Sequence, residues 1–99
     1  MQTIHSYVVI APLFNLGEIV ITIPASDLLA EHGVDPATLL VRHQTWDWSN
    51  MLPESQAENR DALEKGYRIL SSYKIADETV WVITEWDRSV TTILLPSDY

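Results

Sequence analysis

Acidic residues recur at helical spacing between positions 54 and 64. Glu54, Glu58 and Asp61 are separated by four and then three positions, which places them on one side of a helix, and Glu64 lies near that stripe. Like charges four residues apart destabilise an isolated helix by roughly 0.2–0.5 kcal/mol per pair. Such a stripe can present spaced anions to a cleft lined by Arg and Lys, or it can be a solvated face that aids solubility.

Aromatic and apolar residues precede this predicted helix. Trp46 and Trp48 flank Asp47, and Met51 follows three residues after Trp48. Tryptophan is enriched at the energetic hot spots of protein interfaces. One hypothesis is that this loop inserts apolar anchors into a partner beside the acidic helix. The alternative is that the Trp rings fold back and cap a small core.

A second pattern that suggests chemistry is the spacing of His43 and Asp47, four residues apart. On a continuous helix the pair would hold a metal or act as an acid and base. We expect the helix to end between them, and His5 and His32 lie in unrelated segments, so a third ligand is missing. The sequence favours a surface or loop-packing role for His43. We therefore expect no catalytic residue, no metal and no cofactor, and a protein that is not an enzyme.

Charged residues also cluster in a predicted turn at Glu85, Asp87 and Arg88. An active site here would need a nucleophile, and the neighbouring Ser89 has no His close to it in the sequence. We interpret the cluster as a salt-bridged turn. Phosphate-binding loops and paired zinc motifs are absent from the sequence.

Composition limits the classes of partner. The chain has 99 residues, no cysteine, 14 acidic and 6 basic side chains, and a net charge of −8. A body with this charge repels nucleic acid and membrane surfaces and attracts basic ones. Without cysteine there is no disulfide framework or thiol nucleophile. No apolar run approaches the roughly 20 residues that span a bilayer. We expect a single domain over residues 1–99 in the cytoplasm, with no direct binding of nucleic acid or membrane.

Hydrophobic periodicity and breaker residues predict an α+β fold. Ile4–Ala11 and Glu18–Ile23 are expected strands that can form a hairpin. Pro24–His32 is an expected short helix, with Pro near its start and Gly33 after its end, although Ser26 is an alternative cap. Asp35 is expected to cap a second helix that starts at Pro36 and ends near Gln44.

The rest of the chain predicts one more helix and a meander. Thr45–Leu52 has no clear period and is an expected loop, and Pro53 opens a third helix that ends near Lys65, before Gly66. Three β-rich runs with short connections follow, which predicts antiparallel neighbours. These runs are Tyr67–Ile75, Thr79–Trp86 and Val90–Leu95. The expected architecture is an antiparallel β-meander, with an N-terminal strand or hairpin, packed against two to three short helices.

The sequences LLAEHGVDPATLLVRHQTWDW and WVITEWDRSVTTILLP carry a resemblance to known proteins. From Phe14 to Tyr99 the chain resembles a family of small acidic proteins of bacterial plasmids, integrative elements and phages, often labelled plasmid-related or type I restriction subunit M. The resemblance implies that residues 1–12 are an added N-terminal strand segment. It also implies a core position for Trp48. The chain departs from the family pattern His-x-x-Gly-Asp-Trp-Gly, because Trp46 and Ser49 replace both glycines.

The resemblance implies residence on mobile elements, where small acidic proteins include anti-CRISPR and anti-restriction inhibitors that mimic the charge of DNA. A methyltransferase subunit would need a far larger cofactor-binding fold. Together with the charge, the resemblance predicts an inhibitor of a bacterial nucleic-acid-targeting defence complex, of the anti-CRISPR type. Its partner would be a Cas effector or another defence-complex subunit with a basic surface. The expected partner-binding residues are Trp46, Asp47, Met51, Glu54, Glu58, Asp61 and Glu64.

Two alternatives stay open. One is a non-enzymatic interaction module, an accessory protein of a mobile genetic element that binds a partner without mimicking DNA. The other is a small enzyme centred on His43 and Asp47. The oligomeric state is open, with a monomer favoured.

Overall fold

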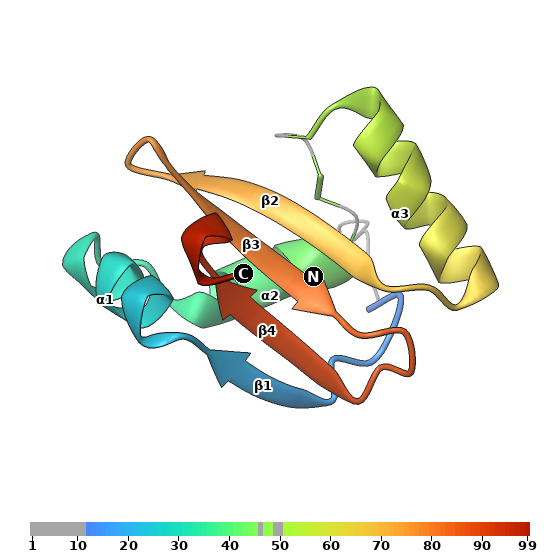
Figure 1. The fold of residues 1–99 in the computed structure, drawn as a ribbon, viewed down its shortest axis with the longest axis horizontal. Helices are drawn as coiled ribbons and strands as arrows, with labels where there is room; N and C mark the ends of the chain where they lie inside the picture. The colour runs from blue at the N-terminus through green and yellow to red at the C-terminus, as the bar shows by residue number, and fades with distance from the viewer. Residues whose placement is uncertain (1–11, 46, 49–50) are drawn as a thin grey trace, which may run out of the picture.

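The centre of the molecule is a four-stranded sheet with the strand order β1-β4-β3-β2 (Figure 1). The computed structural model describes residues 12–45, 47–48 and 51–99. Three antiparallel strands form the meander, namely β2 (Ile69–Ile75), β3 (Glu78–Thr84) and β4 (Val90–Leu94). The prediction of an α+β fold with a meander packed against short helices is confirmed.

Strand β1 (Glu18–Ile21) extends this sheet by pairing in parallel with β4, in the register Glu18 to Val90 and Ile21 to Ile93. The sheet is therefore mixed. Parallel neighbours need a long connection, and here residues 22–89, about two thirds of the chain, lie between the two strands. The other strand partner that the sequence suggested, Ile4–Ala11, falls within residues 1–11, outside the described part of the chain.

Helices α1 (Ile23–Glu31) and α2 (Pro36–Gln44) begin at capping residues that satisfy free backbone N–H groups. The Asp35 carboxylate accepts a hydrogen bond from the backbone N–H of Ala37 at 2.9 Å, as predicted. Helix α1 differs from the prediction. It begins one residue earlier, and the side chain of Thr22, not that of Ser26, accepts the bond from Ala25 N–H.

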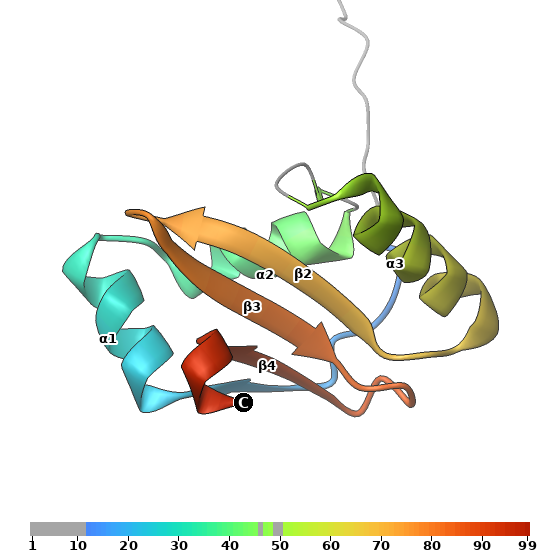
Figure 2. The ribbon, with the colours of Figure 1, turned by 45° about the horizontal axis from the view of Figure 1, so that its top comes forward.

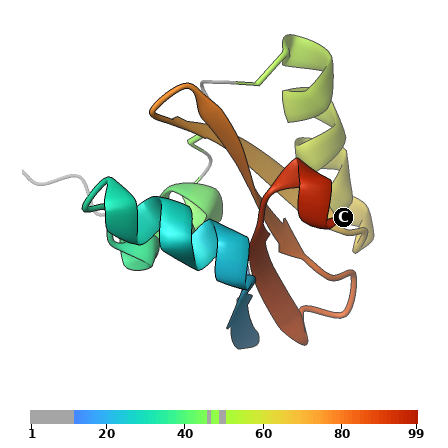
Figure 3. The same cartoon turned by 60° about the vertical axis from the view of Figure 1, so that its left-hand side comes forward.

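Both helices pack on the same face of the sheet, as Figure 3 shows with the sheet turned aside. Alternation along the strands supplies the apolar side chains of that face. Val80 and Val82 of β3 lie there, beside Tyr73 of β2 and Ile93 of β4. Against them the helices bury four apolar side chains, Ala25, Leu28, Leu29 and Leu39. This main core fixes the position of α2, which carries His43.

The opposite face is partly covered by the short helix η1 (Pro96–Asp98) and by Tyr99. The ring of Tyr99 meets Trp81 edge to face with 6.0 Å between centroids, and Arg68 donates to the Tyr99 hydroxyl at 2.7 Å. Asp98 accepts from the Thr22 hydroxyl at 2.7 Å, which ties η1 to the start of α1.

Helix α3 (Pro53–Lys65) stands apart from the other helices, beside the β2 edge of the sheet (Figure 2). It packs on a second, smaller core made by Trp48, Ala62 and Ile69, with Phe14, Met51 and Leu63 partly buried against it. The molecule thus has two cores, and α3 belongs to the smaller one. Within the described residues, every helix is too short or too polar to cross a membrane.

Candidate interaction surface around helix α3

The sequence signals at both ends of α3 act as predicted. Pro53 lies in its first turn, where backbone N–H groups have no partner within the helix, so the N–H that proline lacks costs no hydrogen bond. Gly66 ends the helix with φ of +74°, a left-handed conformation that glycine adopts without strain. The backbone N–H groups of Gly66 and Tyr67 both donate to the carbonyl of Ala62 at 2.9 Å. The helix carrying the acidic stripe is therefore locally well defined.

A single amide side chain joins α3 to the edge of the sheet. Asn59 is 4% exposed and forms two bonds to the backbone of Leu70. Its Nδ2 donates to the Leu70 carbonyl at 2.5 Å, and its Oδ1 accepts from the Leu70 N–H at 3.1 Å. The amide thus takes the place of a neighbouring strand at one position of β2, the outer strand of the sheet that the described residues form.

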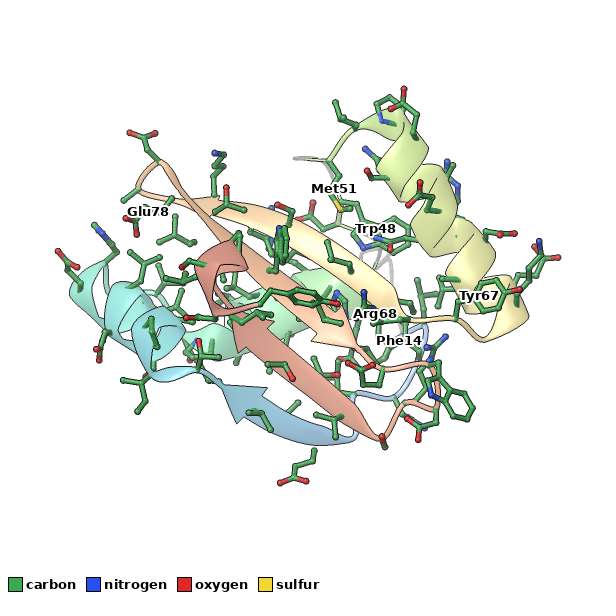
Figure 4. All side chains as sticks on the ribbon, in the orientation of Figure 1. Phe14, Trp48, Met51, Tyr67, Arg68 and Glu78 are labelled. Carbon is green, nitrogen blue, oxygen red and sulfur yellow. The ribbon has the colours of Figure 1, made fainter. Side chains whose placement is uncertain are left out.

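The small core fills the space between α3 and the sheet. Figure 4 shows Trp48 and Met51 between α3 and β2. Trp48 is 2% exposed, so the prediction that it is a core residue is confirmed. Met51 is half-buried, and its sulfur accepts from Asn59 Nδ2 at 3.8 Å. Met51 therefore helps to hold α3, and it offers only part of its surface to a partner.

All four acidic residues of α3 are exposed. They lie on the side of the helix away from its buried residues, Asn59 and Ala62. Asp61 pairs with Lys65 of the same helix at 3.1 Å, a surface contact of little energetic weight. Glu54, Glu58 and Glu64 form no ion pair within the described residues. Helix α3 therefore presents to solvent three carboxylates that form no ion pair with described residues, and Arg60 and Lys65 of the same helix offset part of its negative charge.

The remaining predicted site residues lie in the loop before α3. Asp47 does not extend the acidic stripe as a free charge, because its carboxylate accepts from Arg42 Nε at 2.5 Å. The guanidinium of Arg42 lies 4.3 Å from the Tyr73 ring centroid, which anchors this pair to α2 and the main core. Trp46 lies outside the described residues.

Across the molecule, the two kinds of acidic residue have different surroundings. Five of the seven aspartates bond to described groups through their side chains, namely Asp35, Asp47, Asp61, Asp87 and Asp98. None of the seven glutamates has such a bond among the described residues, and they occur on β1, α1, α3, the start of β3 and the residue after it. Figure 4 places Glu78 at the end opposite α3. The negative charge thus lies on several elements, with its densest stretch on α3.

His43 is fully buried, which contradicts the predicted surface or loop-packing role. Its Nδ1 lies 2.5 Å from the Ser71 hydroxyl, and its Nε2 lies 2.8 Å from the Thr84 hydroxyl. Thr84 lies 2.7 Å from the Thr91 hydroxyl, which donates to the carbonyl of Leu16 at 2.7 Å. The chain of bonds joins α2 to β2, β3, β4 and the segment before β1.

Counting donors fixes the direction of this chain. Thr91 has one hydroxyl proton and gives it to Leu16, so Thr84 must donate to Thr91. Thr84 therefore accepts from Nε2–H of His43, and Nδ1 accepts from Ser71. His43 is neutral with its proton on Nε2. Burial, and after it the positive charge of Arg88, lowers the pKa of His43 to about 3.

This arrangement does not support the small-enzyme alternative. His43 and Asp47 have different partners, since one bonds to buried hydroxyls and the other to Arg42. In the described part of the chain, no three His, Cys, Asp or Glu side chains gather as metal ligands would.

The turn between β3 and β4 is held differently from the prediction of a salt-bridged turn. Arg88 forms no ion pair with a described residue, and its guanidinium donates to three carbonyls. These are Tyr67 at 2.6 Å, Glu85 at 3.1 Å and Ala62 at 3.3 Å. Because the Ala62 carbonyl lies in the last turn of α3, Arg88 connects the turn to the negative end of the helix dipole.

A shallow groove of about 470 Å³ runs along α3, and Leu13, Arg60, Leu63 and Glu64 line it among the described residues. Two of these lining residues are leucines, and the two charged ones have opposite signs. The groove adds apolar surface to the α3 end of the molecule and brings no catalytic group to it.

Sequence reasoning missed two residues of this surface. Asn59 reads as an ordinary polar helix residue, and only its position opposite the open β2 edge gives it a role. Trp86 was expected to continue a strand face, but β3 ends at Thr84 and leaves Trp86 67% exposed in the turn. The acidic pair Glu85 and Asp87 around Trp86 was the available signal for a turn.

Comparison of the chain with protein-family models, with curated proteins and with solved structures found no match. The geometry of the α3 surface and the charge of the chain are therefore the grounds for a functional proposal, beside the sequence resemblance described above.

Proposed function

We propose that this protein is a non-enzymatic inhibitor of a bacterial nucleic-acid-targeting defence complex, of the anti-CRISPR type. It docks its acidic surface into a Lys- and Arg-lined channel and excludes the nucleic acid. The observation that carries the proposal is the row of exposed carboxylates on α3, three of which form no ion pair with a described residue. The choice of a bacterial defence target rests on the resemblance to proteins of mobile elements.

The spacing along α3 suits a polyanion mimic. With a rise of about 1.5 Å per residue, four carboxylates from Glu54 to Glu64 cover about 15 Å. That is one charge per about 4–5 Å, against one per about 3.4 Å along a strand of B-DNA. Asp47, Trp46 and Met51 stay in the proposal as flanking contacts at the start of the helix. Charge would steer the encounter, and apolar contacts would slow dissociation.

The test uses purified Cas effector and restriction complexes in a nucleic-acid-binding competition assay. The variant Glu54→Lys/Glu58→Lys/Asp61→Lys changes the net charge from −8 to −2, since three reversals of two charges each add six. The matched control reverses Asp27, Glu31 and Glu78, three exposed acids on other elements, and has the same net charge.

We expect the α3 variant to lose inhibition at least tenfold and the control to keep most of it. Equal loss in both would mean that overall charge acts without a defined surface. Full inhibition by the α3 variant would contradict the mimic mechanism, and a lack of inhibition of every complex by the unchanged protein would contradict the proposed function.

The second candidate is an interaction module of a mobile element that binds its partner mainly through apolar contacts. The exposed aromatic side chains of Trp86 and Tyr67 favour it. Salt separates the two candidates, because exposed charges are screened over about 8–10 Å at physiological ionic strength. The affinity of a mimic should fall steeply as the salt concentration rises from about 50 to about 300 mM. The affinity of an apolar interface should change little.

A further inference from the structure

The basic residues of this acidic chain are concentrated in two short segments. Residues 60–68 and 85–88 hold four of the six Lys and Arg side chains and four of the 14 acidic ones, so together they have no net charge. These residues are Arg60, Lys65, Arg68 and Arg88, with Asp61, Glu64, Glu85 and Asp87. The other 86 residues hold ten acidic and two basic side chains and therefore carry the whole net charge of −8.

Arg88 joins these two segments to each other and to the chain before β1. Its guanidinium donates to the carbonyls of Ala62, Tyr67 and Glu85, and it lies 5.7 Å from the ring centroid of Phe14. Figure 4 shows Phe14 and Tyr67 at the same end of the molecule, near the end of α3. Three parts of the chain that are far apart in the sequence thus meet around one side chain.

Exposed apolar side chains surround this meeting point. Trp86 is 67% exposed, Tyr67 is 57% exposed and Leu13 is 45% exposed. Leu13 and Leu63 line the groove of about 470 Å³. Each of these four residues is contacted by Arg88 or is next in sequence to a residue that Arg88 contacts. We call these four residues, with the groove, the Arg88 patch.

Within one chain the aromatic ring and the groove do not satisfy each other. Trp86 keeps most of its surface exposed, so it does not fill the groove of its own chain. The turn that carries it is fixed, because the Ser89 hydroxyl and N–H donate to the Asp87 carboxylate at 2.6 and 3.1 Å. A ring on such a fixed backbone loses little further freedom on binding. The groove has a volume within the range of about 300–1,000 Å³ that binding clefts have, which is enough for an aromatic ring.

The distribution of charge indicates which occupant suits this patch. Two copies of a chain with a net charge of −8 repel each other across most of their surfaces. Across two copies of the Arg88 patch this repulsion is absent, and both signs are present in equal number, so each acidic side chain can face a basic one. A two-fold interface needs such a self-complementary surface, because the same residues meet from both sides. Trp and Tyr are also the residues most enriched at interface hot spots.

We infer that the Arg88 patch is the interface of a two-fold homodimer, in which Trp86 of each copy enters the groove that Leu13 and Leu63 line in the other copy. The inference goes beyond the proposed function and does not depend on it. It replaces the monomer that the sequence favoured. Glu54 and Glu58, near the start of α3, lie outside the patch, so the dimer presents two acidic stripes to solvent.

The first test is sedimentation velocity of the full chain from about 5 µM to about 1 mM. We expect a dissociation constant below about 100 µM. It should not rise as the salt concentration increases from about 50 to about 300 mM, because the patch has no net charge and screening weakens the repulsion elsewhere. Trp86→Ala and Leu13→Asn each remove both reciprocal contacts and should weaken association by about 100-fold, at about tenfold per contact. The control Ile23→Ala, 77% exposed on α1, should change it less than about twofold.

The second test mixes Trp86→Ala with Leu13→Asn in equal amounts. One variant keeps the groove and the other keeps the ring, so a mixed dimer retains one of the two contacts. We expect the mixture to associate about tenfold more tightly than either variant alone. Thermal unfolding verifies that each variant is folded.

Three results would overturn the inference. A protein that stays monomeric at about 1 mM would show that its own chain or a different partner covers the groove. Association that weakens with salt would contradict the charge argument, and a mixture that gains nothing would contradict the reciprocal contact. No defence complex takes part in these measurements, so their failure is distinguishable from failure of the proposed function.

Discussion

His43 is the residue whose buried surroundings have the clearest thermodynamic consequence. In the folded protein its imidazole is neutral, bonded on both sides by hydroxyls, with a pKa of about 3. In the unfolded chain its pKa is that of an ordinary histidine, about 6.5. Below pH 6.5 the His43 imidazole binds a proton in the unfolded chain but stays neutral in the folded protein. The contribution of His43 to the free energy of unfolding is therefore fully present above pH 6.5 and decreases as the pH falls toward 3.

We predict that this residue alone lowers the free energy of unfolding by about 2 kcal/mol between pH 7 and 5, at about 1.4 kcal/mol per pH unit. Denaturant unfolding at several pH values gives the free energy of unfolding of the unchanged protein and of His43→Gln. The difference between their pH dependences isolates His43, because the carboxylates contribute equally to both. Equal slopes would contradict the prediction. NMR of the His43 ring offers a second readout, with Nε2 protonated and no titration down to pH 4.

Two glycines in the same left-handed conformation provide a matched pair of substitutions. At Gly17, with φ of +67°, an added Cβ would lie 2.2 Å from the carbonyl oxygen of Ser89. At Gly33, with φ of +63°, it would meet nothing within 4 Å. Gly33→Ala should cost about 1–2 kcal/mol for the backbone conformation alone. Gly17→Ala should cost roughly 1–3 kcal/mol more, because backbone must move. Chemical denaturation measures both, and equal losses would argue against the close approach at Gly17.

At the residue scale, sequence signals were reliable where they act locally. Asp35 before Pro36 and Gly66 after Lys65 mark helix ends through bonds to nearby backbone, and the structure has both ends as predicted. The surroundings of His43 could not be predicted in this way. Ser71 and Thr84 reach it from two strands, Thr91 bonds to Thr84 from a third, and nothing near His43 in the sequence indicates their approach.

At the scale of elements, the attachment of α3 depends on Asn59. Asn59→Ala would leave the N–H and C=O of the half-buried Leu70 without their partner, at up to about 1–3 kcal/mol in total, since water can replace part of the lost bonding. We predict a measurable loss of stability and faster hydrogen exchange of α3 amides than of the main-core strands.

Arg60→Ala on the exposed side of the same helix is the control for Asn59, and a surface substitution of this kind should change stability by no more than about 0.5 kcal/mol. Similar effects of the two substitutions, or unchanged exchange in α3, would show that the small core alone holds the helix.

The order of the helices and strands was predictable because each has its own hydrophobic periodicity and its own residues that mark where it begins and ends. Strand β2 alternates along its whole length, β3 and β4 alternate over their first residues, and the short turns favour antiparallel pairing. The pairing of β1 with β4 was not predictable. Residues 18–21 are apolar enough to pair with any strand, and the choice depends on how α1 and α2 cover the sheet.

At the scale of the whole molecule, the excess of negative charge opposes folding. Few carboxylates have a cation beside them in the described region, so repulsion is largely uncompensated. Raising ionic strength from 10 to 150 mM shortens the screening length from about 30 Å to about 8 Å. We predict an increase in stability on the order of 1 kcal/mol, equivalent to roughly 4–8 °C in Tm for a domain of this size.

Differential scanning fluorimetry measures that increase, and the −2 variants provide the comparison. Their smaller net charge should reduce the increase by more than half, in the α3 variant and in its control alike. A Tm that does not respond to salt in the unchanged protein would mean that charge repulsion is negligible. The total charge and the acidic stripe of α3 follow from the sequence, whereas the exposure of Trp86 required the fold.

The position of β4 between β1 and β3 sets the order in which the sheet can be completed during translation. Strand β1 leaves the ribosome before its hydrogen-bonding partner, which is synthesised about 70 residues later. Until Val90–Leu94 emerges, the apolar side chains of Ile19, Val20 and Ile21 have no sheet to join. The nascent chain must carry them unpaired, where chaperones and other nascent strands compete for them.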